Sequence, residues 1–227
     1  MTTVIVFDLD DTLYEELTYV KSGFCAVAEY LHETYQIDPQ ESLSIMLKKL
    51  TGGRGSIFDS VLKEFDIYTY KNVRKCVSVY RGHTPNITLS KDTEACLARL
   101  AAYHPIYIVT DGNKLVQKKK LITLGLYERV KFCFITYRYG LKHSKPSPYC
   151  FRKICEREKV TPSSVVYIGD NPYKDFVGIK PLGFKTIRIL RGHFKDVKLS
   201  RKYEAEHQIY SLEELGKEYI RRVLTNV

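Results

Sequence analysis

In the stretch Val4-Ile5-Val6-Phe7-Asp8-Leu9-Asp10-Asp11-Thr12-Leu13, an apolar run of strand length is followed at once by a cluster of carboxylates. The run is rich in β-branched residues and lacks polar alternation, which predicts a strand buried on both faces, as in a parallel sheet covered by helices. Ligand sites in such sheets lie outside the carboxyl ends of the strands, where Asp8 and Asp10 would fall. Neighbouring carboxylates repel one another and need a compensating cation, and Mg²⁺ is favoured because it prefers oxygen ligands.

The carboxylates also allow a simpler interpretation, in which they cap a helix or occupy a polar turn. That interpretation accounts poorly for the pattern Asp-x-Asp-x-Thr directly after a buried strand. The choice between a structural and a catalytic role therefore depends on the motifs that follow.

The remainder of the chain divides into a helical part and an alternating part. Apolar residues spaced three and four apart predict helices over 15–36, 40–50, 57–65 and 71–80. Residues 15–85 would then be an all-helical unit inserted after the first strand, and residues 1–14 and 86–227 would form the core. In the core, predicted strands alternate with helices, which indicates a doubly wound α/β fold with a parallel sheet. The strands are expected at 105–109, 130–135, 165–168 and 184–190, and the helices at 90–103, 114–124, 149–159, 175–179 and from the capping box at Ser211 to residue 224.

Three further segments with candidate functional residues follow predicted strands: Thr110-Asp111-Gly112, Lys145-Pro146-Ser147-Pro148 and Gly169-Asp170-Asn171-Pro172-Tyr173-Lys174-Asp175. The first can hold a phosphate through its hydroxyl and its backbone N–H groups, or can be an ordinary strand-to-helix cap. The lysine of the second can stabilise a phosphate or simply lie in a solvated loop. The third suits a metal-binding carboxylate and also a plain turn.

The four segments resemble, in the same order, the four motifs of the haloacid dehalogenase (HAD) superfamily of hydrolases. The helical insertion after the first motif resembles the C1 cap of that family. The resemblance implies a Rossmann-like core and a Mg²⁺-dependent phosphatase that acts on a small phosphorylated metabolite. Asp8 would attack the phosphorus to form an aspartyl-phosphate, and Asp10 would serve as general acid and base. The cap would close over the site and exclude water.

The resemblance also implies how a metal would be held. Mg²⁺ is expected on Asp8, Asp170 and the backbone carbonyl of Asp10, all of which are oxygen ligands. Asp175 is expected to support either the metal or Lys145.

The phosphate of the substrate is expected to contact four residues, namely Thr110, Asp111, Gly112 and Lys145. Asp111 departs from the family's pattern, which often has Asn at this position, and Lys142 is the alternative to Lys145. In the cap, Glu15, Glu16 and Arg54 are the candidate substrate contacts.

An acidic residue two positions after the nucleophile separates phosphate-ester chemistry from dehalogenation and phosphonate hydrolysis in this family, and Asp10 therefore favours a phosphatase. A phosphomutase shares all four motifs and stays an alternative. The net charge of +10 leaves nucleic acid open as a partner, including as the substrate of an end phosphatase. The charges are dispersed, however, and a cap of this size favours small molecules. A non-catalytic scaffold is disfavoured because it has no need of clustered carboxylates.

The composition is that of a folded globular protein, with 44% hydrophobic and 27% charged residues. No run of about 18 apolar residues is present, so no membrane span is expected. The first residues enter a strand directly and do not resemble a secretory signal, so we expect a cytoplasmic protein. The six cysteines are scattered without a Cys-x-x-Cys pair, which predicts reduced thiols rather than a zinc site or disulfides. The sequence does not indicate an oligomeric state.

Overall fold

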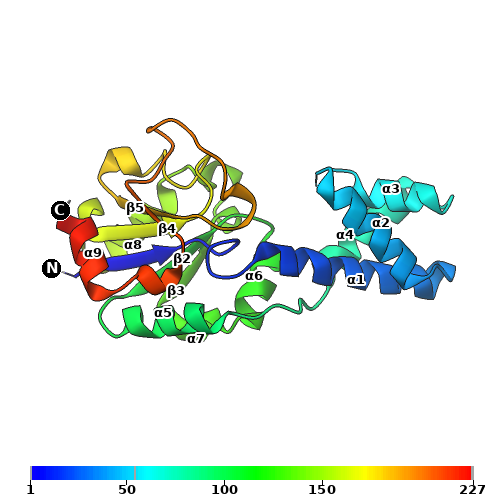
Figure 1. Ribbon diagram of the computed structural model, residues 1–227, viewed down its shortest axis with the longest axis horizontal. Helices are drawn as coiled ribbons and strands as arrows, with labels where there is room; N and C mark the ends of the chain where they lie inside the picture. Colours follow the sequence, from blue (N-terminus) through cyan, green and yellow to red (C-terminus); the bar gives the residue numbers. More distant parts are fainter. Residues whose placement is uncertain (1, 54, 226–227) are drawn as a thin grey trace. The chain divides into compact units, whose positions relative to one another are not determined.

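The computed structural model describes residues 2–53 and 55–225, so the candidate substrate contact Arg54 lies outside the described residues. The α/β part of the chain contains a parallel sheet (Figure 1), whose strand order is β3-β2-β1-β4-β5-β6. The strands are β1 (Val4–Phe7), β2 (Ile106–Thr110), β3 (Phe132–Ile135), β4 (Val165–Gly169), β5 (Lys185–Ile189) and β6 (His207–Ile209). The predicted Rossmann-like α/β fold is confirmed by this sheet.

Strand β1 lies in the middle of the sheet, as its unbroken apolar sequence predicts. Phe7 is in register with Ile108 of β2 on one side and with Ile168 of β4 on the other. All four side chains of β1 are completely buried, because helices cover both faces of the sheet. The backbone N–H of Asp8 donates to the carbonyl of Ile168 at 2.8 Å, so that the ladder extends to the first carboxylate.

Alternation along β1 distributes its side chains between two hydrophobic layers. Val4 and Val6 belong to a buried cluster that contains Phe151 and Ile154 of helix α8 (Tyr149–Glu158). The intervening residues Ile5 and Phe7 point to the opposite face. The other helices of the core are α5 (Lys91–Ala101), α6 (Lys114–Thr123), α7 (Leu126–Arg129) and α9 (Lys217–Thr225).

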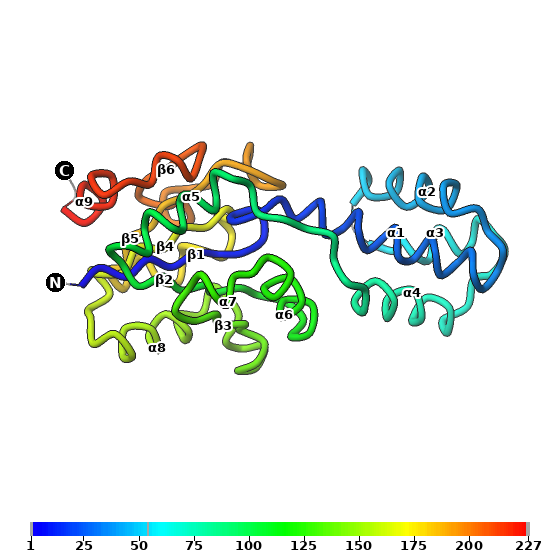
Figure 2. Tube along the Cα trace, turned by 90° about the horizontal axis from the view of Figure 1, so that it is seen from below, coloured from blue at the N-terminus to red at the C-terminus, as the bar shows by residue number. Residues whose placement is uncertain are grey.

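Residues Leu17–Ile87 form a second compact unit, and the core comprises the chain on either side of it. The unit contains α1 (Glu16–Tyr35, which starts one residue earlier), α2 (Pro39–Thr51), α3 (Ile57–Glu64) and α4 (Tyr70–Gly82). It has a hydrophobic core of its own, built from residues such as Phe24, Leu31 and Val61. Figure 2 follows the chain from β1 into α1 and from α4 to α5. The role of this helical unit as a cap stays a prediction.

Several predicted elements were wrong in extent or kind. Residues 175–179 form turns rather than a helix, and a short 3₁₀ helix follows at Lys180–Leu182. The capping box of Ser211 is present, but it begins a single 3₁₀ turn (Leu212–Glu214), and α9 begins only at Lys217, after Gly216. Strand β6 and helix α7 were not predicted, because three or four residues are too few for a periodic pattern.

The described residues contain no helix that is both long and apolar enough to cross a bilayer. All six cysteines are free thiols, and four of them are buried. Burial raises the pKa of Cys133 and Cys150 to about 12, so these thiols stay protonated and act as small apolar side chains.

The close approach of two loops at the carboxyl edge of the sheet requires a glycine at position 178. A Cβ atom there would lie 1.7 Å from the carbonyl oxygen of Pro146, which is a backbone atom that cannot rotate away. Gly178→Ala should therefore lower the free energy of unfolding by about 1–3 kcal/mol, as overpacking typically does. Urea denaturation of the wild type and the variant measures this difference.

Gly216→Ala is the matched control, because a Cβ at position 216 meets no atom within 4 Å. Its free energy of unfolding should change by no more than about 0.5 kcal/mol. Equal denaturation midpoints for the two variants would contradict the proposed contact between Gly178 and Pro146.

Candidate active site

The predicted site residues lie at the carboxyl edge of the sheet. Asp8 directly follows β1, Thr110 ends β2 and Asp170 directly follows β4, and these three strands are neighbours. Lys145 comes from the loop after β3. Parallel strands bring their carboxyl ends to one side, so side chains distant in sequence converge there.

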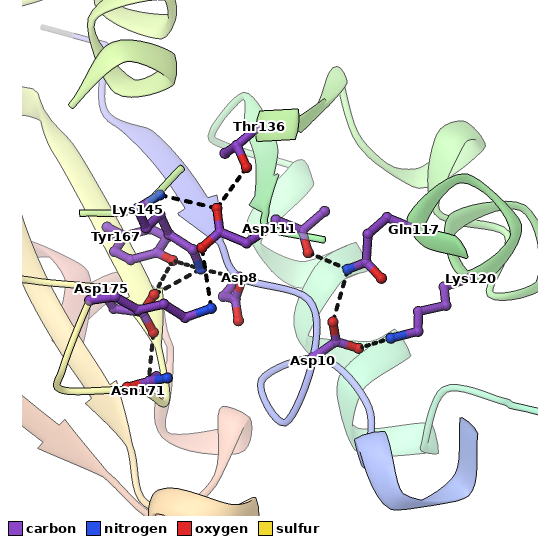
Figure 3. A network of polar contacts seen from close by, with 12 residues as sticks. Asp8, Asp10, Asp111, Gln117, Lys120, Thr136, Lys145, Tyr167, Asn171 and Asp175 are labelled. Carbon is purple, nitrogen blue, oxygen red and sulfur yellow. Dashed lines mark hydrogen bonds and ion pairs between the residues drawn. The ribbon is translucent and has the colours of Figure 1, made fainter. Parts of the chain in front are cut away.

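Lys145 is the buried cation of the site. Its Nζ lies 2.6 Å from Oδ1 of Asp8 and 2.8 Å from Oδ1 of Asp175, and it donates to the hydroxyl of Tyr167 at 3.0 Å. Figure 3 shows these groups pointing toward one another. Burial alone would lower the pKa of Lys145, but the charges of Asp175 and Asp8 outweigh it and hold the pKa well above its usual value. Lys142, the alternative lysine, is exposed.

A cluster of three carboxylates surrounds this cation. One oxygen from each of Asp8, Asp170 and Asp175 lies within 4.8 Å of the others. Burial raises the pKa of Asp8 to about 7, against the attraction of Lys145. Burial together with the charges of Asp175 and Asp8 raises the pKa of Asp170 to about 9. If all three carboxylates were ionised, the cluster would carry more negative charge than the surrounding protein stabilises.

A divalent cation would relieve this excess, and an all-oxygen donor set suits Mg²⁺. Asp175 is already engaged, because Tyr167 and Lys145 contact Oδ1 and the backbone N–H of Asn171 donates to Oδ2 at 2.9 Å. Asp8 and Asp170 are thus the better candidates for direct ligands, and the supporting role of Asp175 stays a prediction. The backbone of Asp170 is fixed by Arg188, whose Nε donates to its carbonyl at 3.2 Å.

Asp10 lies two residues after Asp8 but belongs to a different polar network (Figure 3). Its Oδ1 accepts from Lys120 Nζ at 2.7 Å and from the hydroxyl of Tyr14 at 2.6 Å, while its Oδ2 accepts from Gln117 at 2.8 Å. Burial alone would raise the pKa of Asp10, but the ion pair with Lys120 and these hydrogen bonds lower it. The carboxylate of Asp10 is therefore directed away from the cluster of Asp8, Asp170 and Asp175, and the predicted contact of its backbone carbonyl with a metal stays a prediction.

Both carboxylate oxygens of Asp111 contact other residues of the protein. Its Oδ1 accepts from the backbone N–H of Lys145 at 3.1 Å and from the hydroxyl of Thr136 at 2.7 Å, and its Oδ2 pairs with Lys174 at 3.2 Å. Burial opposes ionisation of Asp111, but Lys145 and Lys174 outweigh it and lower the pKa. An ionised carboxylate only accepts hydrogen bonds, so the predicted phosphate contact at this position is restricted to the backbone N–H.

Three polar residues near the site, Gln117, Lys120 and Lys174, were not predicted to have a role. Gln117 and Lys120 are three residues apart on α6, and the same buried surface includes Val116 and Leu121. The sequence does contain a signal for Gln117 and Lys120. Both lie on the apolar stripe of a helix that follows a candidate phosphate loop, where buried polar residues are unusual. Lys174 lies within the fourth motif and pairs with Asp111.

The chain is similar in sequence to proteins of one hydrolase family. A family model described as haloacid dehalogenase-like hydrolase matches residues 2–183. The glyceraldehyde 3-phosphate phosphatase of Methanocaldococcus jannaschii is 30% identical over 93% of this chain and 94% of its own length. The enzyme of the same name from Pyrococcus furiosus is 28% identical over 93% of this chain and 90% of its own length.

Solved structures show the same fold. The HAD-hydrolase YfnB of Bacillus subtilis, determined with bound magnesium, superposes with a TM-score of 0.65 at 21% identity and covers 94% of this chain and 96% of its own. A HAD phosphatase from Thermococcus onnurineus has a TM-score of 0.60 at 24% identity and covers 94% of this chain and 95% of its own. The family match over residues 2–183, together with these relatives, shows that the chain belongs to the haloacid dehalogenase-like hydrolases.

Proposed function

We propose that the protein is a Mg²⁺-dependent phosphatase that hydrolyses a small phosphomonoester through an aspartyl-phosphate on Asp8. The observation that carries the proposal is the contact between the buried Asp8 carboxylate and Lys145 at 2.6 Å, beside Asp170. The relatives named as glyceraldehyde 3-phosphate phosphatases, and a 31% identical match over 37% of the chain to a phosphoserine phosphatase of Thermus thermophilus, favour a three-carbon phosphate ester.

Asp8 is suited to be the nucleophile because its carboxylate is held in a fixed place. Attack by one carboxylate oxygen forms an acyl-phosphate bond and breaks the ester bond between the phosphorus and the leaving oxygen. Asp10 supplies a proton to that oxygen, and the product alcohol departs. Asp10 then takes a proton from the water that attacks the phosphorus, which releases inorganic phosphate and restores Asp8.

The approach of an anionic nucleophile to an anionic ester requires positive charge in a site with little water. Lys145 supplies a fixed ammonium group that contacts Asp8 directly. Mg²⁺ held by Asp8 and Asp170 would neutralise further charge on the phosphoryl oxygens. The ammonium group of Lys145 is therefore already in place before the substrate binds.

The hydroxyl of Thr110 is arranged to donate to a phosphate oxygen. Its Oγ1 accepts a hydrogen bond from Nε2 of Gln117 at 2.6 Å, so its own hydrogen must point elsewhere. Backbone N–H groups of Asp111 and Gly112 are the other proposed donors, and Gly112 has a φ of +132°, which favours glycine. Together with Lys145, these groups would bind the phosphate and leave Asp10 for the leaving group.

Replacing the nucleophile tests the proposal. Asp8→Asn removes the carboxylate that forms the covalent bond, and turnover should fall by at least about 10³-fold. The measurement is phosphate release with Mg²⁺ from glyceraldehyde 3-phosphate, phosphoserine, sugar phosphates, nucleotides and p-nitrophenyl phosphate, and EDTA should abolish it. Asp92→Asn, at an exposed position, is the control and should retain wild-type rates. Wild-type rates in Asp8→Asn would overturn the assignment.

Metal binding should be coupled to pH. In the unfolded chain the carboxyls of Asp8 and Asp170 titrate near pH 4, whereas in the folded, metal-free protein their pKa values are about 7 and about 9. The folded state then binds more protons, so the stability of the metal-free protein should fall as pH rises through this interval. Mg²⁺ favours the ionised carboxylates, so its stabilising effect should grow over the same interval.

Thermal unfolding with EDTA and with excess Mg²⁺, compared at about pH 6 and about pH 9, measures this coupling. Asp170→Asn removes the group with the higher pKa, and the growth of the Mg²⁺ effect with pH should be smaller in that variant. A Mg²⁺-induced change in melting temperature that is the same at both pH values would contradict the proposed site.

A further inference from the structure

Two polar side chains of α6 are buried next to the proposed general acid. Gln117 is 2% exposed and Lys120 is 3% exposed, and both contact the carboxylate of Asp10. We propose that Gln117 and Lys120 are positioning residues that hold Asp10 for proton transfer to the leaving group and couple it to the phosphate-binding hydroxyl of Thr110. This inference rests on the phosphatase function proposed above.

Lys120 is held by its contact with Asp10. Burying an ammonium group is unfavourable unless a charged partner accompanies it. The Nζ of Lys120 lies 2.7 Å from Oδ1 of Asp10, in a pair whose side chains are 4% and 23% exposed. The ring of Tyr14 lies below the same ammonium, with its centroid 5.9 Å from Nζ, and the hydroxyl of Tyr14 donates to the same carboxylate oxygen. One oxygen of Asp10 is thus fixed from two directions.

Gln117 fixes the second oxygen of Asp10 and links it to Thr110. Its Nε2 has two hydrogens, and it lies 2.8 Å from Oδ2 of Asp10 and 2.6 Å from Oγ1 of Thr110. The carboxylate is an acceptor, so the amide must present its nitrogen to Asp10. One side chain therefore orients both the carboxylate proposed for acid–base catalysis and the hydroxyl that would face the phosphate.

The position of these groups follows from the start of α6. The side chain of Asn113 caps the helix by accepting from the backbone N–H groups of Leu115 and Val116. Three residues separate the end of β2 at Thr110 from the start of α6 at Lys114. Residues 117 and 120 are one turn apart, so both project from the same side of the helix. The loop proposed to bind the phosphate and the two groups that hold Asp10 thus belong to one short, capped segment.

The leaving group provides a measurement that separates positioning from a merely structural role. An alkyl phosphate needs a proton on its leaving oxygen, whereas p-nitrophenolate departs without one. The ratio kcat/KM reports the steps up to formation of the covalent intermediate, in which Asp10 acts as an acid. A defect in the position of Asp10 should therefore be selective for the alkyl ester, and a general defect should affect both esters equally.

The experiment compares Lys120→Met and Lys120→Arg with the wild type on glycerol phosphate and p-nitrophenyl phosphate. Lys120→Met should lower kcat/KM for the alkyl ester by about 10²-fold, within the range of general acid catalysis, and for p-nitrophenyl phosphate by no more than about 3-fold. Lys120→Arg retains the charge and should recover part of the loss. Lys118→Met, an exposed position of the same helix, should behave as the wild type.

Gln117→Leu is the second variant and removes both hydrogen bonds of the amide. It should lower kcat/KM for both esters, because Thr110 loses its orienting donor, with the larger loss for the alkyl ester. In an Asp10→Asn background, the selective loss caused by Lys120→Met should disappear, since the two side chains act through one step.

Each outcome decides the inference. Equal losses on both esters in Lys120→Met, no loss at all, or a selective loss that persists in the Asp10→Asn background would overturn it while leaving the phosphatase function intact. If Lys120→Met does not fold, as judged by thermal unfolding, Lys120→Arg and Gln117→Leu take its place. For each, the loss of kcat/KM on glycerol phosphate is compared with the loss on p-nitrophenyl phosphate. If the folded wild-type protein with Mg²⁺ hydrolyses neither ester nor any member of the substrate panel, the proposed function itself fails.

Discussion

The buried ammonium of Lys145 is the contact on which the geometry of the site depends. It joins Asp8 after β1 to Asp175 after β4, and its own backbone N–H is held by Asp111 after β2. Three loops from neighbouring strands are thereby fixed by one residue of a fourth loop. Four carboxylates of this region face the two ammonium groups of Lys145 and Lys174. When all four carboxylates are ionised, two negative charges remain, and one divalent cation would balance them.

The carboxyl groups of Asp8 and Asp10 in the first motif have pKa values shifted in opposite directions. Asp8 is deeply buried and has a raised pKa, whereas Asp10 has a lowered pKa because Lys120, Tyr14 and Gln117 outweigh burial. Each carboxylate has its own cation from a different element, Lys145 for one and Lys120 for the other. In the metal-free protein Asp10 therefore ionises more readily than Asp8.

The fold and the motif residues could be predicted because their signals are local. Strand β1 is an unbroken apolar run, and its carboxylates follow immediately. Strand β6 could not be predicted, since it has three residues and one of them is exposed. Gln117 and Lys120 are ordinary polar residues of a helix by sequence, and only the packing of α6 places them at Asp10. The orientation of Asp111 toward Lys145 likewise depends on tertiary contacts.

The interrupted core has a consequence for how the chain assembles. Strands β1 and β2 pair directly although they are roughly a hundred residues apart, and the entropy of closing a loop grows with its length. The helical insertion has its own core, and the backbone N–H of Asn86 donates to Ser22 Oγ at 2.8 Å, which ties its two ends together. Once those helices have formed, the loop between the strands behaves as one of about thirty residues. Closing it costs about 1 kcal/mol less than closing a flexible loop of about a hundred residues. The sequence of events with the smallest entropic barrier therefore forms the helices before the sheet.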